Sequence, residues 1–287
     1  EVDTRFGVAR YDGSDRYLLD GEALVPATER DGGPLGEGCT RYRPRVEGAF
    51  AHIQRCGTSA TDYHWLVRDR AGTLFVYGEG DNARLASYRD PRSIFAWSLE
   101  RVEDTNGNIT RFFYFLDASS GPGEPFRQLY PLKIEYTSHT GGAAAAYRVD
   151  FDRDDANRPD RISTGRPGFK VVTRSLLRDI RVSFQNQVVR TYVLTYAHGL
   201  FQKTLLAKIH VFGTLRCGPG LNAFLSPACR GPLSEPHEFS YVTEPEAFGN
   251  PDSWTVDGGA SELTEAGRSA QGVFLSDQLE GGHLFQV

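Results

Sequence analysis

Hydrophobic and polar residues alternate with a period of two along most of the chain. Ile180, Val182 and Phe184 are separated by polar residues, and the same alternation recurs over 192–196 and in both halves of 132–151. Such alternation predicts β-strands with one apolar and one polar face. We therefore expect hairpins in these segments.

Helical spacing is confined to two short segments. Segment 83–97 reads ARLASYRDPRSIFAW, where Pro91 interrupts the pattern, and segment 199–208 reads GLFQKTLLAK. Because period two dominates elsewhere, we predict an all-β fold of antiparallel hairpins, arranged in an extended or shell-like curved sheet with few short helices.

Two segments share one hairpin pattern. The first reads WLVRDRAGTLFVYGE and the second LERVEDTNGNITRFFYF, and both place an Asp-x-x-Gly turn between apolar strands. Asp69 and Gly72 of the first correspond to Asp104 and Gly107 of the second. The Asp accepts hydrogen bonds from backbone amides across the turn, and the Gly takes the left-handed conformation. We interpret the pair as an internal repeat of structural turns.

The second turn also resembles a calcium loop, because Asp104, Asn106 and Asn108 carry oxygen side chains at alternate positions. In an EF-hand loop counted from Asp104, the sixth position is Gly and the twelfth is Glu, whereas this sequence has Ile and Phe there. Asn106-Gly107 instead fits a two-residue hairpin turn, in which both residues have positive φ. We favour the turn over the calcium site.

The alternating pattern weakens towards the C-terminus. Segments 116–128 and 216–236 are rich in Gly, Pro and Ser, which predicts loops. We place a domain boundary at Glu244, so that 1–243 form a β-sheet domain and 244–287 form a linker or the start of a following segment.

Charge and composition exclude some function classes. The net charge of -5 gives no overall attraction to nucleic acid or to an anionic membrane. No apolar run approaches the length of a membrane span, and the N-terminus has no hydrophobic signal core. The chain has no Met, which suggests an internal fragment or a processed product of a longer polypeptide.

The four cysteines form two pairs that are close in sequence, Cys39 with Cys56 and Cys217 with Cys229. Four cysteines allow three connectivities, and we favour pairing between sequence neighbours over free thiols. A zinc site is less well supported because no C-x-x-C spacing exists. Disulfides would indicate a secreted or extracellular protein.

No motif of catalysis or cofactor binding is present. The sequence lacks G-x-S-x-G, H-E-x-x-H, P-loop and G-x-G-x-x-G patterns, so we predict no catalytic residue, no cofactor and no metal. The acidic stretch DFDRDDANRPD, which holds Asp150 and Asp160, is interspersed with Arg and favours local ion pairs over a cation site. Glu244 and Glu246 form a carboxylate pair, but their position alone is no evidence of chemistry.

A basic strand face is the remaining candidate site. Arg alternates with apolar residues from Arg41 to Arg55, a pattern compatible with binding of anionic sugars or phosphates. Because the whole chain is acidic, we favour the alternative that these Arg residues pair with Asp and Glu.

A longer series of segments resembles a known family. The segments DRYLLDGEALVP, DYHWLVRDRAGTLFVYG and DPRSIFAWSLERVEDTNGN occur in the order found in the N-terminal region of SpvB-type virulence proteins and of the TcB-type subunits of insecticidal toxin complexes. The likeness spans residues 4–242, and the hairpins resemble divergent Rhs or YD repeats. The tail from Ala247 onwards matches nothing in this family.

The resemblance implies a scaffold without catalytic activity. In that family the region contributes β-sheet to a hollow shell that encloses a toxic C-terminal polypeptide, and its partners are a β-propeller, an Rhs shell and a pore-forming subunit. One alternative is a secreted module that binds carbohydrate or a cell surface, which predicts exposed Trp65, Trp97 and Trp254. The other is an ADP-ribosyltransferase, but the required Arg, Ser-Thr-Ser and Glu-x-Glu series is not present in order.

Overall fold

The chain divides into two units, Glu1–Tyr241 and Val242–Val287. The computed structural model describes residues 1–27, 35–119, 125–154, 158–213 and 236–241, together with two strands of the second unit. These two strands, β19 (Phe274–Ser276) and β20 (Leu284–Gln286), pair antiparallel. Glu244 lies outside the described residues, and the domain boundary that we place there stays a prediction.

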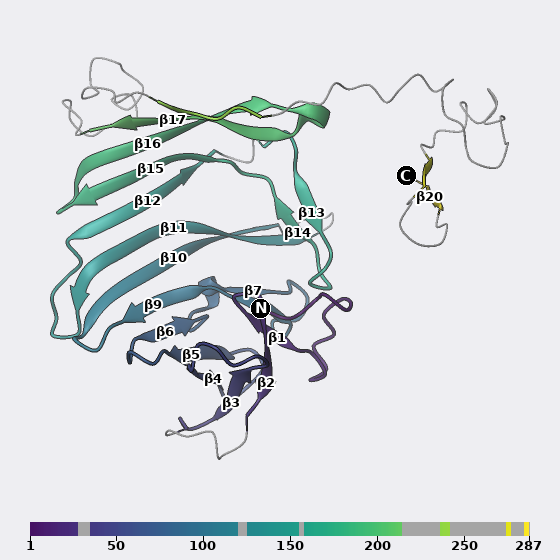
Figure 1. Cartoon of the computed structure of the whole chain (residues 1–287), viewed down its shortest axis with the longest axis vertical. Helices are drawn as coiled ribbons and strands as arrows, with labels where there is room; N and C mark the ends of the chain where they lie inside the picture. Colours follow the sequence, from purple (N-terminus) through teal and green to yellow (C-terminus); the bar gives the residue numbers. More distant parts are fainter. Residues whose placement is uncertain are drawn as a thin grey trace. The chain divides into compact units, whose positions relative to one another are not determined.

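The first unit is built on one large sheet of 16 strands (Figure 1). Its main path runs β1-β2-β3-β4-β5-β6-β9-β10-β11-β12-β15-β16-β17-β18, so that nearly every strand pairs with its neighbour in sequence. All pairs are antiparallel except β11 with β14, which is parallel. The predicted all-β fold of antiparallel hairpins is therefore confirmed. The strands of this sheet are β1 (Tyr17–Leu19), β2 (Glu22–Pro26), β3 (Cys39–Pro44), β4 (His52–Cys56), β5 (His64–Arg68), β6 (Leu74–Tyr77), β9 (Leu99–Glu103), β10 (Asn108–Ser119), β11 (Phe126–His139), β12 (Tyr147–Arg153), β13 (Ile162–Thr164), β14 (Val171–Thr173), β15 (Leu177–Phe184), β16 (Gln187–His198), β17 (Thr204–Phe212) and β18 (His237–Glu238).

Both expected hairpins form, since β11 pairs with β12 and β15 pairs with β16. Ile134 pairs with Val149 and Tyr136 with Tyr147, and the two Tyr rings stack with centroids 5.1 Å apart. Aromatic pairs across neighbouring strands stabilise a sheet. The loop predicted over 116–128 is shorter than expected, since β10 continues to Ser119 and β11 begins at Phe126. The predicted loop 216–236 lies almost entirely outside the described residues.

The helix expected over 83–97 is wrong. The segment forms a hairpin of β7 (Arg84–Ala86) and β8 (Ile94–Trp97), preceded by the 3-10 turn η2 (Asp81–Ala83). The Ser93 amide donates to the Asp90 carbonyl at 2.9 Å and closes a turn around Pro91. Because proline cannot continue a helix and β8 consists mainly of β-branched and aromatic residues, the strand conformation is preferred.

The second expected helix, over 199–208, is also mostly strand. Its first residues form the 3-10 turn η3 (Leu200–Gln202), and β17 begins at Thr204. Pairing of β17 along its own full length with Thr191–His198 of β16 stabilises the extended conformation more than the short helical pattern favours a helix.

The hydrophobic core of the first unit lies in residues 1–97, which we call the core region. Tyr17, Tyr42, Trp65 and Trp97 form a cluster whose neighbouring rings meet edge to face, with centroids 5.0 to 5.9 Å apart. Val2 pairs with Tyr17 and its amide donates to the Phe95 carbonyl at 2.8 Å. The N-terminal segment thereby covers the free edge of β1 and closes the core.

Candidate interaction surface

The turn that begins at Asp69 connects β5 to β6. The Asp69 carboxylate accepts a hydrogen bond from the Thr73 amide at 2.9 Å, and the Gly72 amide donates to the Asp69 carbonyl at 3.0 Å. Gly72 has a φ of 90°, a conformation that residues with a side chain rarely adopt. The turn therefore has the two features expected from the sequence pattern: an Asp carboxylate that accepts a backbone amide, and a Gly with positive φ.

The Asp104 turn repeats this geometry between β9 and β10. Its carboxylate accepts hydrogen bonds from the amides of Asn106 at 2.8 Å and Asn108 at 2.9 Å. Hydrogen bonds donated by Asn108 are the main cause that lowers the pKa of the Asp104 carboxyl below its ordinary value. The Asp104 carboxylate, the only charged group among the three oxygen side chains that suggested calcium, is thus engaged by the turn itself.

The expected turn type at Asn106-Gly107 is wrong in detail. The Gly107 amide donates to the Asp104 carbonyl at 3.0 Å, so Thr105 and Asn106 are the central residues, and within this turn Gly107 alone has positive φ, 82°. This arrangement strains one residue rather than two and leaves the Asp carboxylate free to bind the amides. A two-residue turn with both φ values positive occurs instead at Gln185-Asn186.

A third turn of the same kind was not apparent from the sequence. Between β11 and β12, the Gly142 amide donates to the His139 carbonyl at 3.0 Å, and the Gly141 amide donates to His139 Nδ1 at 2.8 Å. His139 stands 35 residues after Asp104, which stands 35 residues after Asp69. His139 replaces the Asp of the motif, and the constant spacing together with Gly142 is the signal that identifies it.

The second and third turns lie side by side. His139 Nε2 makes a hydrogen bond of 2.8 Å with the Asn106 carbonyl, and the Thr140 amide donates to the Gly107 carbonyl at 2.9 Å. A Cβ atom at Gly72 would stand 2.7 Å from the Thr105 side chain. The three turns therefore form a contiguous row at one end of the strands, and close packing between them requires glycine at positions 72 and 107.

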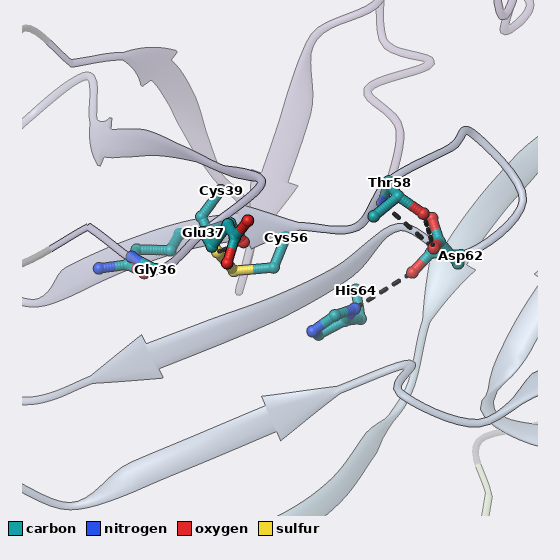
Figure 2. The surroundings of a disulfide bond; sticks show 8 residues. Gly36, Glu37, Cys39, Cys56, Thr58, Asp62 and His64 are labelled. Carbon is teal, nitrogen blue, oxygen red and sulfur yellow. Dashed lines mark hydrogen bonds between the residues drawn. A yellow bond between two sulfur atoms is a disulfide. The ribbon is translucent and has the colours of Figure 1, made fainter.

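The Cys39 and Cys56 sulfur atoms form a disulfide between paired positions of β3 and β4 (Figure 2). Asp62, in the following loop, accepts hydrogen bonds from the amides of Ser59 at 2.8 Å and Thr58 at 3.1 Å. These two bonds lower the pKa of Asp62 to about 2. Cys217 and Cys229 lie outside the described residues, so their pairing stays a prediction.

The described residues of the acidic stretch, 150–154 and 158–160, are engaged in local contacts. Asp150 pairs with Arg148 at 2.8 Å, and the Leu176 amide donates to Asp154 at 2.7 Å. Asp160 pairs with Arg158 at 3.0 Å. Across the described part of the chain, no group of three His, Cys, Asp or Glu residues is placed to hold a metal ion.

Strands β10, β11, β12, β15, β16 and β17 form the part of the sheet that we call the open sheet. Its polar face is a network of opposite charges: Lys133 stands opposite Asp150, and Glu135 stands opposite Arg148. Lys133 and Glu135 also pair within β11 at 2.6 Å. Directly opposed charges of opposite sign stabilise neighbouring strands.

The other face of the open sheet is apolar and continuous across the strands. Register places one apolar row across β10, β11, β12 and β15 and a second, aromatic row beside it, in which the Tyr147 and Phe184 rings lie 4.8 Å apart. The residues of these two rows are Phe112, Ile134, Val149 and Val182, then Tyr136, Tyr147 and Phe184. A third row on this face consists of Phe151, Ile180 and Tyr192.

None of these ten side chains is fully buried among the described residues. Phe184 is 38% exposed, and the others are half-buried. By contrast, Ile53 and Val76 in the first strands of the sheet are 1% and 0% exposed. A row of side chains on one sheet is shielded in part by its own neighbours, so the intermediate exposure indicates that the described residues cover this face only incompletely. The apolar face is the candidate interaction surface.

The edge of the open sheet is a second candidate surface. In the described part of the chain, β17 is paired on its outer side by the two-residue strand β18, at Lys208 and Ile209. An edge strand with unpaired backbone groups is a template for a further strand. The sheet can therefore be extended laterally as well as covered.

The comparisons with known proteins agree with this architecture. Residues 2–137 match the family model described as SpvB, the Salmonella virulence plasmid 65 kDa B protein. A search of curated proteins found no match.

Three solved structures share the fold. The N-terminal domain of effector protein SpvB from Salmonella typhimurium strain LT2 is 21% identical with a TM-score of 0.62, over 74% of this chain and 85% of that one. The TcdB2-TccC3-TEV structure is 20% identical with a TM-score of 0.62, and the Tc holotoxin pore of Photorhabdus luminescens is 20% identical with a TM-score of 0.60. Each match covers 75% of this chain and 13% of the toxin chain.

The resemblance to SpvB-type proteins and toxin-complex subunits is therefore confirmed. The chain has the fold of the SpvB N-terminal domain, and it spans only a small part of the toxin-complex chains that it matches. No described helix is long and apolar enough to cross a membrane.

Proposed function

We propose that the chain is a non-catalytic structural module of a secreted toxin. It contributes β-sheet to a shell that encloses or presents a toxic C-terminal polypeptide. The observation that carries this proposal is the uncovered apolar face of the open sheet, whose side chains form three rows across up to four strands.

Physical chemistry favours a covered state for such a face. Burial of apolar surface stabilises by about 25 cal/mol per Å², so a face of this extent gains stability when another layer packs on it. Hairpins that cannot bury their apolar sides singly gain further stability from lateral pairing, as in repeat proteins. Covering of the apolar face and lateral pairing of the strands both occur when the sheet forms part of the shell of a larger assembly.

The partners in this proposal are other segments or subunits of a toxin complex. By analogy with the similar folds, these are a β-propeller, an Rhs-type shell and a pore-forming subunit, and the complex acts outside the producing cell. The Cys39–Cys56 disulfide supports a secreted location because such bonds persist in oxidising surroundings.

Two adjacent residues of β16 provide a matched test. Leu194 belongs to the same face as Tyr192, whereas Thr195 lies on the polar face opposite Lys208. We expect the 287-residue chain to self-associate at micromolar concentration and to bind an apolar dye. Leu194→Glu should weaken both effects, and Thr195→Glu should weaken neither. Sedimentation velocity and dye fluorescence measure the two effects.

The proposal is wrong if the native chain is monomeric and binds no dye, or if the two substitutions act alike. Hydrolysis of NAD or a glycan that is lost on mutation of Glu244 or Glu246, which lie outside the described residues, would establish an enzyme instead. The carbohydrate-binding alternative is weakened by the burial of Trp65 and Trp97, which are 6% and 9% exposed. Trp254 lies outside the described residues.

A further inference from the structure

A cavity of about 640 Å³ opens in the core region, apart from the open sheet. Leu24, Ile94 and Trp97 contribute apolar walls, and each is less than 10% exposed. The N-terminal segment before β1, the strands β1, β2, β3, β4 and β8 and the loops between them supply the remaining lining. The volume is in the range of pockets that hold small ligands or short peptide segments.

The charged side chains that line the cavity are mostly cationic. Arg92 is bound by Asp90 at 2.9 Å. The other guanidinium groups of the lining belong to Arg16, Arg45 and Arg55, and none of them forms an ion pair with a carboxylate of the described residues. Arg16 lies close enough to Asp3 to contribute to the lowered pKa of that carboxyl, which is itself paired with Arg5. Arg16 and Arg45 are exposed, whereas Arg55 is half-buried.

The one carboxylate in the lining does not neutralise these cations. Asp15 accepts hydrogen bonds from the backbone amides of Arg10 at 2.9 Å and Tyr11 at 2.5 Å. A carboxylate bound to two amides has most of its acceptor capacity engaged locally. The cavity therefore keeps an excess of positive charge.

Arg55 is held in place by aromatic rings. Its guanidinium carbon lies 4.3 Å from the centroid of Tyr63, 5.5 Å from Tyr17 and 5.6 Å from Tyr42. It donates one hydrogen bond, of 2.8 Å, to the Tyr17 hydroxyl. A guanidinium has five N–H donors, so most of them are available to a ligand while the rings fix its position.

The tyrosines around Arg55 do not supply negative charge. Burial raises the pKa values of Tyr17 and Tyr42 above the ordinary tyrosine value, so both hydroxyls stay neutral at physiological pH. A partner for Arg55 must therefore come from outside the described residues.

We propose that this cavity binds an acidic peptide segment, whose carboxylate meets Arg55 while its apolar neighbours contact Leu24, Ile94 and Trp97. Arg16 and Arg45 attract the segment at the opening and pair with flanking carboxylates. A charge-assisted bond between guanidinium and carboxylate is stronger than one between neutral groups, and a fixed guanidinium loses less entropy on binding.

The lining favours a peptide over an acidic sugar. A sugar ring brings several hydroxyl donors, and each needs an acceptor when it is buried. Among the described lining residues the single carboxylate, that of Asp15, is already bound, and the Tyr17 hydroxyl already accepts from Arg55. A Glu side chain brings acceptors alone and suits a lining rich in donors.

The test uses the full 287-residue chain and two blocked pentapeptides, Glu-Leu-Glu-Leu-Glu and Gln-Leu-Gln-Leu-Gln, in calorimetric titrations. We expect the Glu peptide to bind at least tenfold more tightly at low salt, and this difference to shrink as salt is raised. Arg45→Gln combined with Arg16→Gln should remove most of the difference. Arg70→Gln, an exposed Arg outside the cavity, is the matched control and should leave it unchanged.

The proposal would be overturned if both peptides bound equally or if neither bound. It would also be overturned if Arg70→Gln lowered the affinity for the Glu peptide as much as the cavity variants do. Tighter binding of trigalacturonate than of the Glu peptide would assign the cavity to an acidic sugar instead. Because none of these titrations involves the apolar face of the open sheet, the outcome does not depend on the scaffold role proposed above.

Discussion

The core region and the open sheet belong to one continuous sheet but bury their apolar residues differently. In the core region, Trp65 and Trp97 lie in an aromatic cluster that the N-terminal segment closes. In the open sheet, the Tyr147 and Phe184 rings lie side by side, 4.8 Å apart and tilted, and remain partly exposed. The same hairpin architecture thus produces a self-contained core at one end and an incomplete layer at the other.

The difference shows where each part obtains its stability. The core region is stabilised by burial among its own residues and by a disulfide. The open sheet depends on strand pairing, on opposed charges such as Lys133 and Asp150, and on whatever layer covers its apolar face. Under the proposed scaffold role both parts are needed. The core region keeps the chain folded, and the open sheet binds other segments of the assembly.

The largest expected effect comes from Trp65→Ala. Trp65 is 6% exposed and contacts three other aromatic rings, so its loss should lower the free energy of unfolding by about 3 to 5 kcal/mol. Phe151→Ala in the open sheet is the comparison and should cost about 1 kcal/mol, because that side chain is only half-buried. Urea denaturation of both variants measures the difference, and equal losses would remove the distinction between the two regions.

Loss of the disulfide comes next. The Cys39 and Cys56 positions are 17 residues apart, a loop for which a crosslink contributes about 3 kcal/mol in the chain-entropy account. Replacement of both residues by Ser should lower the unfolding midpoint of the core region and leave amide protection in β15 and β16 unchanged. Non-reducing peptide mapping of the native chain checks the pairing and also tests the predicted Cys217–Cys229 bond. Crossed pairs or four free thiols would contradict the assignment.

A smaller effect is expected at the turn between β9 and β10. Gly107→Val should cost more than about 1 kcal/mol, because it places a β-branched side chain at a φ of 82°. The new Cβ would also stand 2.5 Å from the Thr140 hydroxyl of the next turn. Gly48→Val has no such neighbour and should be almost neutral. Calcium should not raise the melting temperature of the native chain; a rise abolished by Asp104→Ala would restore the metal interpretation.

The smallest effect is a pH dependence in the core region. Backbone amides of Ser59 and Thr58 lower the pKa of Asp62 from 3.8 to about 2. A lowered carboxyl pKa stabilises the fold at pH values above about 4, and this contribution is lost as pH falls towards 2. The urea midpoint should therefore drop more steeply over this range in the native chain than in Asp62→Asn. If the urea midpoint fell equally with pH in the native chain and in Asp62→Asn, the Asp62 contacts would contribute nothing to stability.

The sequence predicted the strands and their pairing better than the turns. Alternation predicted that Tyr136 and Tyr147 lie on facing apolar positions of a hairpin, because a period of two places every second residue on one face; the structure adds that they pair directly. The helix over 83–97 failed because a weak local pattern competes with pairing between Arg84 and Trp97, which only the fold creates. The turn at His139 was missed because imidazole nitrogen there accepts the amide bond that Asp accepts elsewhere.

The surfaces could not be predicted from spacing. Arg55, Tyr17 and Tyr63 come from separate strands and loops, and no sequence interval shows that their side chains meet. Likewise, alternation predicts an apolar face but cannot show whether another layer covers it. Exposure is a property of the whole fold, which is why the structure was needed to distinguish the open sheet from the core region.

The most direct test of the account is the chemical accessibility of matched thiols in the two regions. Val76→Cys lies in the core region, where Val76 is 0% exposed, and Val149→Cys lies on the apolar face of the open sheet. With the native chain as the background control, a small thiol reagent should label Val149→Cys within about tenfold of its rate in urea, while Val76→Cys should be protected at least a hundredfold. Equal protection of both thiols would show that the apolar face is already covered and would contradict the proposed scaffold role.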